Sequence, residues 1–71
     1  MKTAFFNNND FTYFAEVKRV EAVKDAFSLK ITSQWQSAKN PDEEQTQLQV
    51  TCTKNDLEKL AQLLSEGVRN V

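Results

Sequence analysis

The sequence predicts a small α+β domain, in which a three-stranded antiparallel β-meander packs against one C-terminal α-helix. Two segments, 27–36 and 45–52, alternate apolar and polar residues with a period of two, as half-buried strands do. A third segment, 11–23, alternates in the same way but changes phase once. After residue 53 the apolar residues recur with helical spacing. Residues 2–6 could add a short fourth strand at the N-terminus.

Length and composition limit the possibilities further. The 71 residues leave room for a single domain over 1–71 with one core. A chain of this size buries only about 60% of the surface that its unfolded form exposes, so its stability is marginal. One Cys and no His exclude an internal disulfide and the usual zinc ligand sets. We therefore expect neither a metal nor a cofactor.

Charge and hydropathy bear on partners and location. Nine Lys and Arg against ten Asp and Glu give a net charge of −1, so no global field attracts nucleic acid or acidic lipid. No apolar run approaches the roughly 18 residues of a membrane span. The apolar run Ala4–Phe6 is too short for the core of a signal peptide, which needs roughly 7–15 residues. We expect a cytoplasmic protein with no membrane partner.

The two regular strands each have one apolar side. In the first, this side carries Phe27, Leu29, Ile31, Ser33 and Trp35. In the second, it carries Thr46, Leu48, Val50 and Cys52. The other sides carry mainly Ser, Thr and Gln, which is typical of a sheet with one buried face and one wet face.

The phase change in segment 11–23 needs a structural explanation. One set of apolar residues has odd numbers and the other has even numbers: Tyr13, Ala15 and Val17, then Val20 and Ala22. We interpret the change as a β-bulge at Lys18–Arg19, combined with a tight turn at Lys24–Asp25. In that register Lys18 and Arg19 together face Lys30, Val17 faces Ile31, and Ala15 faces Ser33. All apolar pairs then lie on one face.

Turn and cap signals divide the chain. Asn7–Asn9 predicts a turn, and Ser37–Glu43 predicts a loop around Pro41. Thr53 and Asp56 have the spacing of a capping box at a helix start, and Gly67 predicts the helix end. The apolar stripe of this helix consists of Leu57, Leu60, Ala61, Leu63, Leu64 and Val68.

No residue pattern indicates catalysis. Without His, no Ser–His or Cys–His pair exists. Cys52 precedes a helix start, which can activate a thiol, but its place in the apolar alternation favours a buried packing role. We therefore expect the chain not to be an enzyme.

The leading hypothesis is a protein–protein interaction module that binds another protein or itself. Its binding surface would be a sheet edge or the N-terminal aromatic residues Phe5, Phe6, Phe11 and Phe14. Phe5, Phe6 and Phe14 could instead pack over one end of the sheet as a separate cluster. Size and plain composition would suit an inhibitor or accessory protein encoded by a phage or another mobile element.

The alternative is an accessory protein that binds nucleic acid. Lys18, Arg19 and Lys30 would contact phosphates there. Against this stands the simpler interpretation that Glu16 and Glu21 neutralise these cations on a solvated surface.

Overall fold

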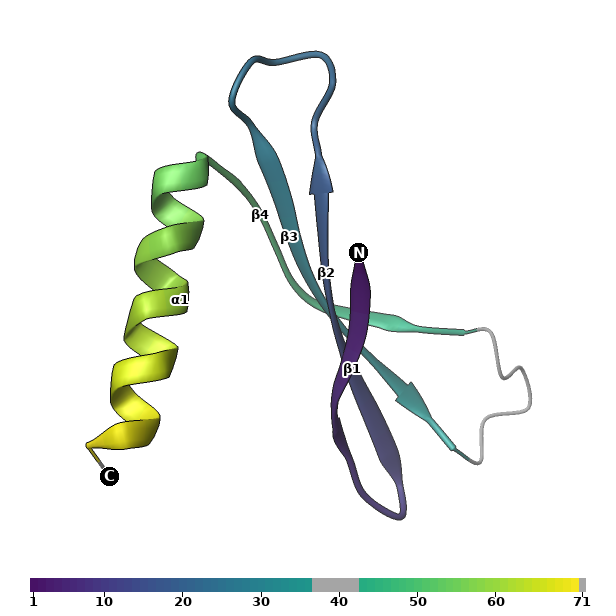
Figure 1. Ribbon diagram of the computed structural model, residues 1–71. Helices are drawn as coiled ribbons and strands as arrows, with labels where there is room; N and C mark the ends of the chain where they lie inside the picture. The colour runs from purple at the N-terminus through teal and green to yellow at the C-terminus, as the bar shows by residue number, and fades with distance from the viewer. Residues whose placement is uncertain (37–42, 71) are drawn as a thin grey trace.

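The computed structural model describes residues 1–36 and 43–70, and it confirms the α+β fold (Figure 1). Four antiparallel strands pair in chain order as a meander. A helix follows the last strand directly. The elements are β1 (Lys2–Asn7), β2 (Phe11–Arg19), β3 (Phe27–Trp35), β4 (Gln45–Cys52) and α1 (Lys54–Arg69). The fourth strand suggested for residues 2–6 is therefore present as β1, while the loop predicted over 37–43 falls outside the described residues except at Glu43.

The first hairpin turns where the Asn run predicts it. Asn8 Oδ1 accepts hydrogen bonds from the backbone N–H groups of Asp10 at 2.8 Å and Phe11 at 2.7 Å. The backbone N–H of Asn8 in turn donates to the Phe11 carbonyl at 2.9 Å. An Asn side chain that satisfies the amides after it holds the chain in a turn, which fixes where β2 begins.

The predicted register between β2 and β3 is wrong by two residues. Val17 pairs with Leu29, not with Ile31, and Ala15 pairs with Ile31. No bulge occurs at Lys18–Arg19, because the two strands pair without interruption from Phe11↔Trp35 to Arg19↔Phe27. A shift of two residues preserves the faces, so the apolar pattern alone does not distinguish the registers.

A longer connection replaces the predicted tight turn. Residues 20–26 leave the sheet, which explains the phase change without a bulge in β2. The backbone N–H of Val20 donates to the Ala26 carbonyl at 2.9 Å and closes this loop. Asp25 adopts a left-handed backbone with φ 57°, a conformation that Asp tolerates better than most residues.

Bulges do occur in the outer strands. The register shifts between Ala4 and Phe6 in β1, and on β4 opposite Ile31/Thr32. The second shift corrects a prediction: Thr46 pairs with Thr32, so it lies on the polar side of the sheet and not on the side of Leu48. The extra residue is Gln47, whose side-chain amide donates to Ser33 Oγ at 2.9 Å.

The helix begins as predicted but ends later. Thr53 Oγ1 accepts from the backbone N–H of Asp56 at 3.2 Å, and Asp56 Oδ2 accepts from the backbone N–H of Thr53 at 3.1 Å. This is a complete capping box. Gly67 does not end the helix, which continues to Arg69 with Asn70 as C-cap. Gly67 has no positive φ, so its backbone continues the helix as other residues do.

The capping box leads to a test of helix stability. We expect Thr53→Ala to lower the free energy of unfolding by about 1 kcal/mol, because it leaves the backbone N–H of Asp56 without its side-chain acceptor. The backbone N–H of Thr53 lowers the pKa of the Asp56 carboxyl, and the Thr53 hydroxyl contributes in the same direction. Since the folded-state pKa is lowered, this stabilisation is complete above the ordinary Asp pKa and is lost as the pH falls through the lowered value.

Thermal unfolding followed by far-UV circular dichroism checks both statements. The unmodified chain should lose helix stability on acidification below about pH 4. Asp56→Asn should already be weaker at neutral pH, and should lose less on acidification. An equal acid dependence in the two chains would contradict the role given to Asp56.

The core is small even for this chain length. Within the described residues, the buried apolar side chains are those of Ala26 and Leu29, and α1 buries none of its residues. The radius of gyration is 14.2 Å, against about 11 Å for a compact chain of this length. The molecule is also flat, measuring 39 × 38 × 16 Å. In the described part of the chain, no helix has the length and hydropathy needed to cross a membrane.

Candidate functional site

One side of the sheet carries most of its large apolar residues. Residues that pair directly share a side, so Ala15 and Val17 of β2 lie beside Ile31 and Leu29 of β3. Leu48 and Val50 of β4 continue the same rows. This side, together with the apolar stripe of α1, is called the apolar face below. Its principal members are Phe5, Phe6, Tyr13, Ala15, Val17, Leu29, Ile31, Leu48, Val50, Leu60, Leu63, Leu64 and Val68.

The helix lies over this side of the sheet without closing onto it. Between them runs an apolar groove of about 460 Å³. Two helix residues, Leu60 and Leu64, form one wall. All four strands contribute to the other wall, with Phe5, Ala15, Leu29, Ile31 and Leu48. Because neither wall carries a charged side chain, the groove is suited to an apolar occupant.

The second half of the helix is the most exposed part of the apolar face. The exposed fractions are 65% for Leu63, 60% for Leu64 and 80% for Val68. These three residues and Gly67 border a second hollow of about 600 Å³. Sequence reasoning assigned this stripe to an intramolecular core, and therefore missed it as a binding surface. The sequence feature that could have indicated a binding surface is the width of the stripe. Leu63 makes the stripe wider than contact with one sheet requires.

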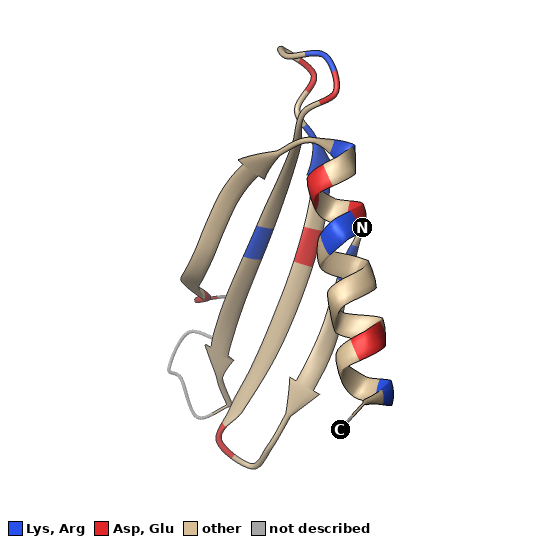
Figure 2. Ribbon diagram, turned by 90° about the vertical axis from the view of Figure 1, so that its left-hand side faces the viewer, with Lys and Arg blue, Asp and Glu red and all other residues tan. Residues whose placement is uncertain are grey.

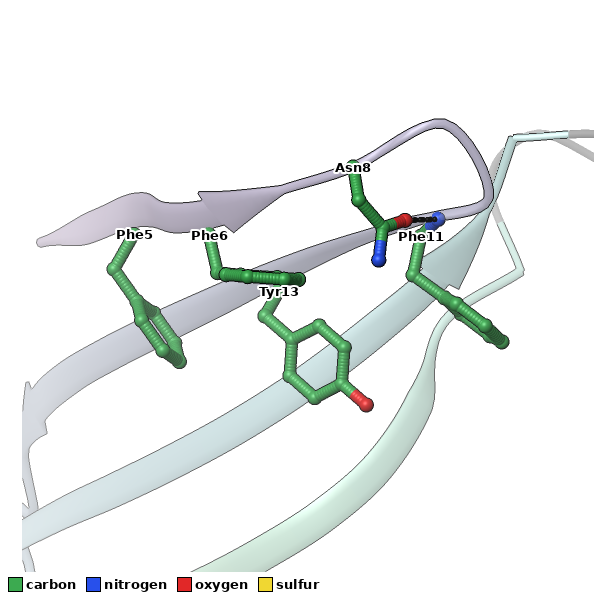
Figure 3. Close-up of a pocket in the computed structure, with 5 residues that line it drawn as sticks. All are labelled: Phe5, Phe6, Asn8, Phe11 and Tyr13. Carbon is green, nitrogen blue, oxygen red and sulfur yellow. Dashed lines mark hydrogen bonds between the residues drawn. The ribbon is translucent and has the colours of Figure 1, made fainter.

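The N-terminal aromatic residues gather at one end of the same face. Phe5, Phe6 and Phe11 surround Tyr13, with ring centroids 6.3, 5.7 and 6.3 Å from the Tyr13 centroid and edge-to-face geometry. With Asn8 they line a shallow pocket of about 440 Å³ (Figure 3). The rings of Phe5 and Phe6 remain 57% and 49% exposed. The two alternatives foreseen for these residues thus coexist, since the rings form a cluster that is still accessible.

Phe14 does not belong to this cluster. It pairs with Thr32 and Ala4, which places it on the polar side of the sheet. There the Lys2 ammonium lies 4.8 Å from the ring centroid and forms an ion pair with Glu44 at 2.7 Å. The ion pair connects β1 with the residue that precedes β4, on the polar side of the sheet. Half-exposed pairs of this kind contribute at most about 1 kcal/mol, but this one covers Phe14.

The structure does not bring the three predicted cations together. Lys18 and Lys30 lie on the polar side, whereas Arg19 pairs with Phe27 on the opposite side. Glu16 pairs with Lys30, and its carboxylate lies 3.7 Å from Lys18 Nζ. In Figure 2 the charged residues colour mainly the helix and the loops, and only short stretches of the strands. An acidic residue between the two lysines reduces their attraction for phosphate.

Cys52 lies where its alternation predicted, opposite Phe27 on the apolar side. It is a free, half-buried thiol rather than a fully buried one. Among residues 1–36 and 43–70, no group of three His, Cys, Asp or Glu is placed to hold a metal ion. The groove and the second hollow of the apolar face are lined by apolar side chains and can make apolar contacts.

Comparisons with models of protein families, with curated proteins and with solved structures found no match to this chain. The case for function consequently depends on the geometry of the apolar face.

Proposed function

We propose that the chain is a non-enzymatic protein-binding module that acts through the apolar face. The observation that supports this most strongly is where its exposed large apolar residues lie. Among residues 1–36 and 43–70, all of them except Met1 and Val23 are on the apolar side of the sheet or on α1. A contiguous apolar patch of this kind on a small protein usually marks a binding surface for another protein.

The groove and the aromatic pocket supply different parts of such an interface. The groove between Leu64 and Leu48 can take aliphatic side chains of a partner. The rings of Phe5 and Phe6 offer flat area at low entropic cost, as aromatic residues do at the centres of many interfaces. Phe11 packs on Trp35 with centroids 4.5 Å apart and extends this surface.

Site-specific photo-crosslinking tests the proposal. A photoreactive residue at Leu64 should yield a crosslinked protein that is identified by mass spectrometry. The identified protein, once purified, should rebind the unmodified chain and should bind Leu60→Lys at least about tenfold more weakly, because a buried charge lacks a partner. The same probe at Val23, which is equally exposed but lies in the β2–β3 loop, is the control.

Two results would overturn the proposal. One is crosslinking at Leu64 no stronger than at Val23. The other is binding of labelled single-stranded DNA or RNA that weakens steeply with added salt and depends on Lys18 and Lys30, which would favour the nucleic-acid alternative. Size and composition further lead us to propose that this module is an inhibitor or accessory protein encoded by a phage or another mobile element.

A further inference from the structure

We infer that the partner of the apolar face is a second copy of this chain, bound about a two-fold axis through the groove and the second half of α1. This inference depends on the proposed function, since it names the occupant of the same face. Three observations favour a second copy over an unrelated protein: the excess of exposed area, the uncharged lining of the groove and the second hollow, and the incomplete core.

The exposed area of the chain is large enough to include an interface of the size that a stable dimer buries. The chain exposes 5914 Å², whereas a folded monomer of 8.2 kDa exposes about 4,500 Å². The excess is about 1,400 Å² for each chain. If each copy buried that much, the interface would total about 2,800 Å², which lies within the range of roughly 2,000–5,000 Å² for obligate homodimers.

The charge distribution permits the face to meet itself. In a two-fold interface each residue on the patch also meets the patch, so a charge near the axis would face its own copy. The residues that line the groove and the second hollow are all uncharged. Arg19, opposite Phe27, is the charge of β2 on the apolar side, and it lies at the end of that strand. The net charge of −1 adds little repulsion between copies.

The incomplete core favours a partner that is always present. Leu29 is the single large apolar side chain that the described residues bury, and it is still 9% exposed. The groove beside it separates the sheet from the helix that the sequence supplies to cover it. A chain that completes its core only in a complex needs its partner at a matching concentration, and a second copy meets this condition at every expression level.

Sedimentation equilibrium of the full chain tests the inference. The unmodified chain should be a dimer at micromolar concentration, with a thermal midpoint that rises with concentration. Leu64→Lys should raise the dimer dissociation constant at least about a hundredfold, because each of the two symmetry-related lysines weakens association about tenfold. Val23→Lys introduces the same charge at a similar exposed fraction outside the face, and should leave the dissociation constant unchanged.

A second measurement covers the case in which Leu64→Lys does not fold. In a mixture of isotope-labelled and unlabelled unmodified chains, filtered nuclear Overhauser spectra should show contacts between Leu64 methyl groups of one copy and apolar residues of the other. A dimer that lacks these contacts, or that tolerates Leu64→Lys, would overturn the inference. So would a monomer at every concentration.

The outcome also separates the two proposals. A monomeric chain whose Leu64 probe captures a different protein, which then rebinds in purified form, contradicts the second copy and supports the binding module. A monomeric chain with no specific crosslink at Leu64 contradicts both.

Discussion

Leu29→Ala should abolish the cooperative unfolding transition, or should reduce the free energy of unfolding by about 2–5 kcal/mol. Leu29 stands in the centre of the sheet, between Val17 of β2 and Val50 of β4. It also lines the groove opposite the helix. Truncating it removes apolar contacts with both neighbouring strands and widens the groove, and the strands cannot fill the added space without distortion.

The loss caused by Leu29→Ala should be large relative to the free energy of unfolding, because that free energy is small. A domain of this length typically has a free energy of unfolding of roughly 4–10 kcal/mol. This chain, with so few buried side chains, should lie towards the low end of that range. Loss of one central leucine therefore removes a large share of the total.

Chemical denaturation at a fixed chain concentration measures the effect. Val23→Ala is the control, because it removes aliphatic atoms from an exposed loop residue and should change the free energy of unfolding by less than about 0.5 kcal/mol. Similar losses in the two variants would show that Leu29 is not the centre of the core.

Tyr13→Ala should have the next largest effect, with a loss of about 3 kcal/mol and collapse of the near-UV circular dichroism signal. Its ring makes edge-to-face contacts with three phenylalanine rings from β1 and β2. Such pairs each contribute about 0.5–1.5 kcal/mol beyond simple burial. Removing the central ring breaks all three contacts at once and frees β1 from the packing that holds its bulge.

Tyr13→Phe is the matched control, because it keeps the ring and removes the hydroxyl only. We expect it to retain most of the stability and the near-UV signal. If Tyr13→Ala and Tyr13→Phe behaved alike, the aromatic cluster would have no structural role. Because the cluster is one end of the apolar face, Tyr13→Ala should also weaken binding by that face.

The sequence predicted the elements because local signals specify them. The alternation through Phe27–Trp35 marks a strand with two different sides, and the spacing of Thr53 and Asp56 marks a helix start. The Asn8 side chain likewise forms the hydrogen bonds that stabilise its own turn. Each of these signals acts over a few residues and needs no knowledge of the tertiary structure.

Register and bulges were not predictable in the same way. Lys24–Asp25 is not a sequence that enforces a tight turn, and a loop over residues 20–26 satisfies the same apolar pattern. Register is specified only to within an even number of residues when one face is apolar, so the two-residue error left the faces intact. The bulge at Gln47 depends on the pairing of β4 with Thr32 and Ser33 of β3, which no local signal reports.

The candidate site was partly predictable. The Phe5 and Phe6 rings lie on an accessible surface, as the cluster of aromatic residues suggested. Phe14 lies on the other side because the odd–even alternation of β2 places it there. The spacing of the helix stripe predicts a side that faces the core, but amphipathic spacing is the same whether a helix packs on its own sheet or on a partner.

In this structure the helix buries none of its residues against its own sheet. Hydrogen exchange followed by mass spectrometry tests it directly, by comparing the peptide that covers α1 with peptides from β2 and β3 as the chain is diluted. We expect the α1 amides to lose protection on dilution well before those of β3, and to regain it when the chain is concentrated again. Protection of α1 that equals that of β3 at every concentration would show that the sheet itself holds the helix.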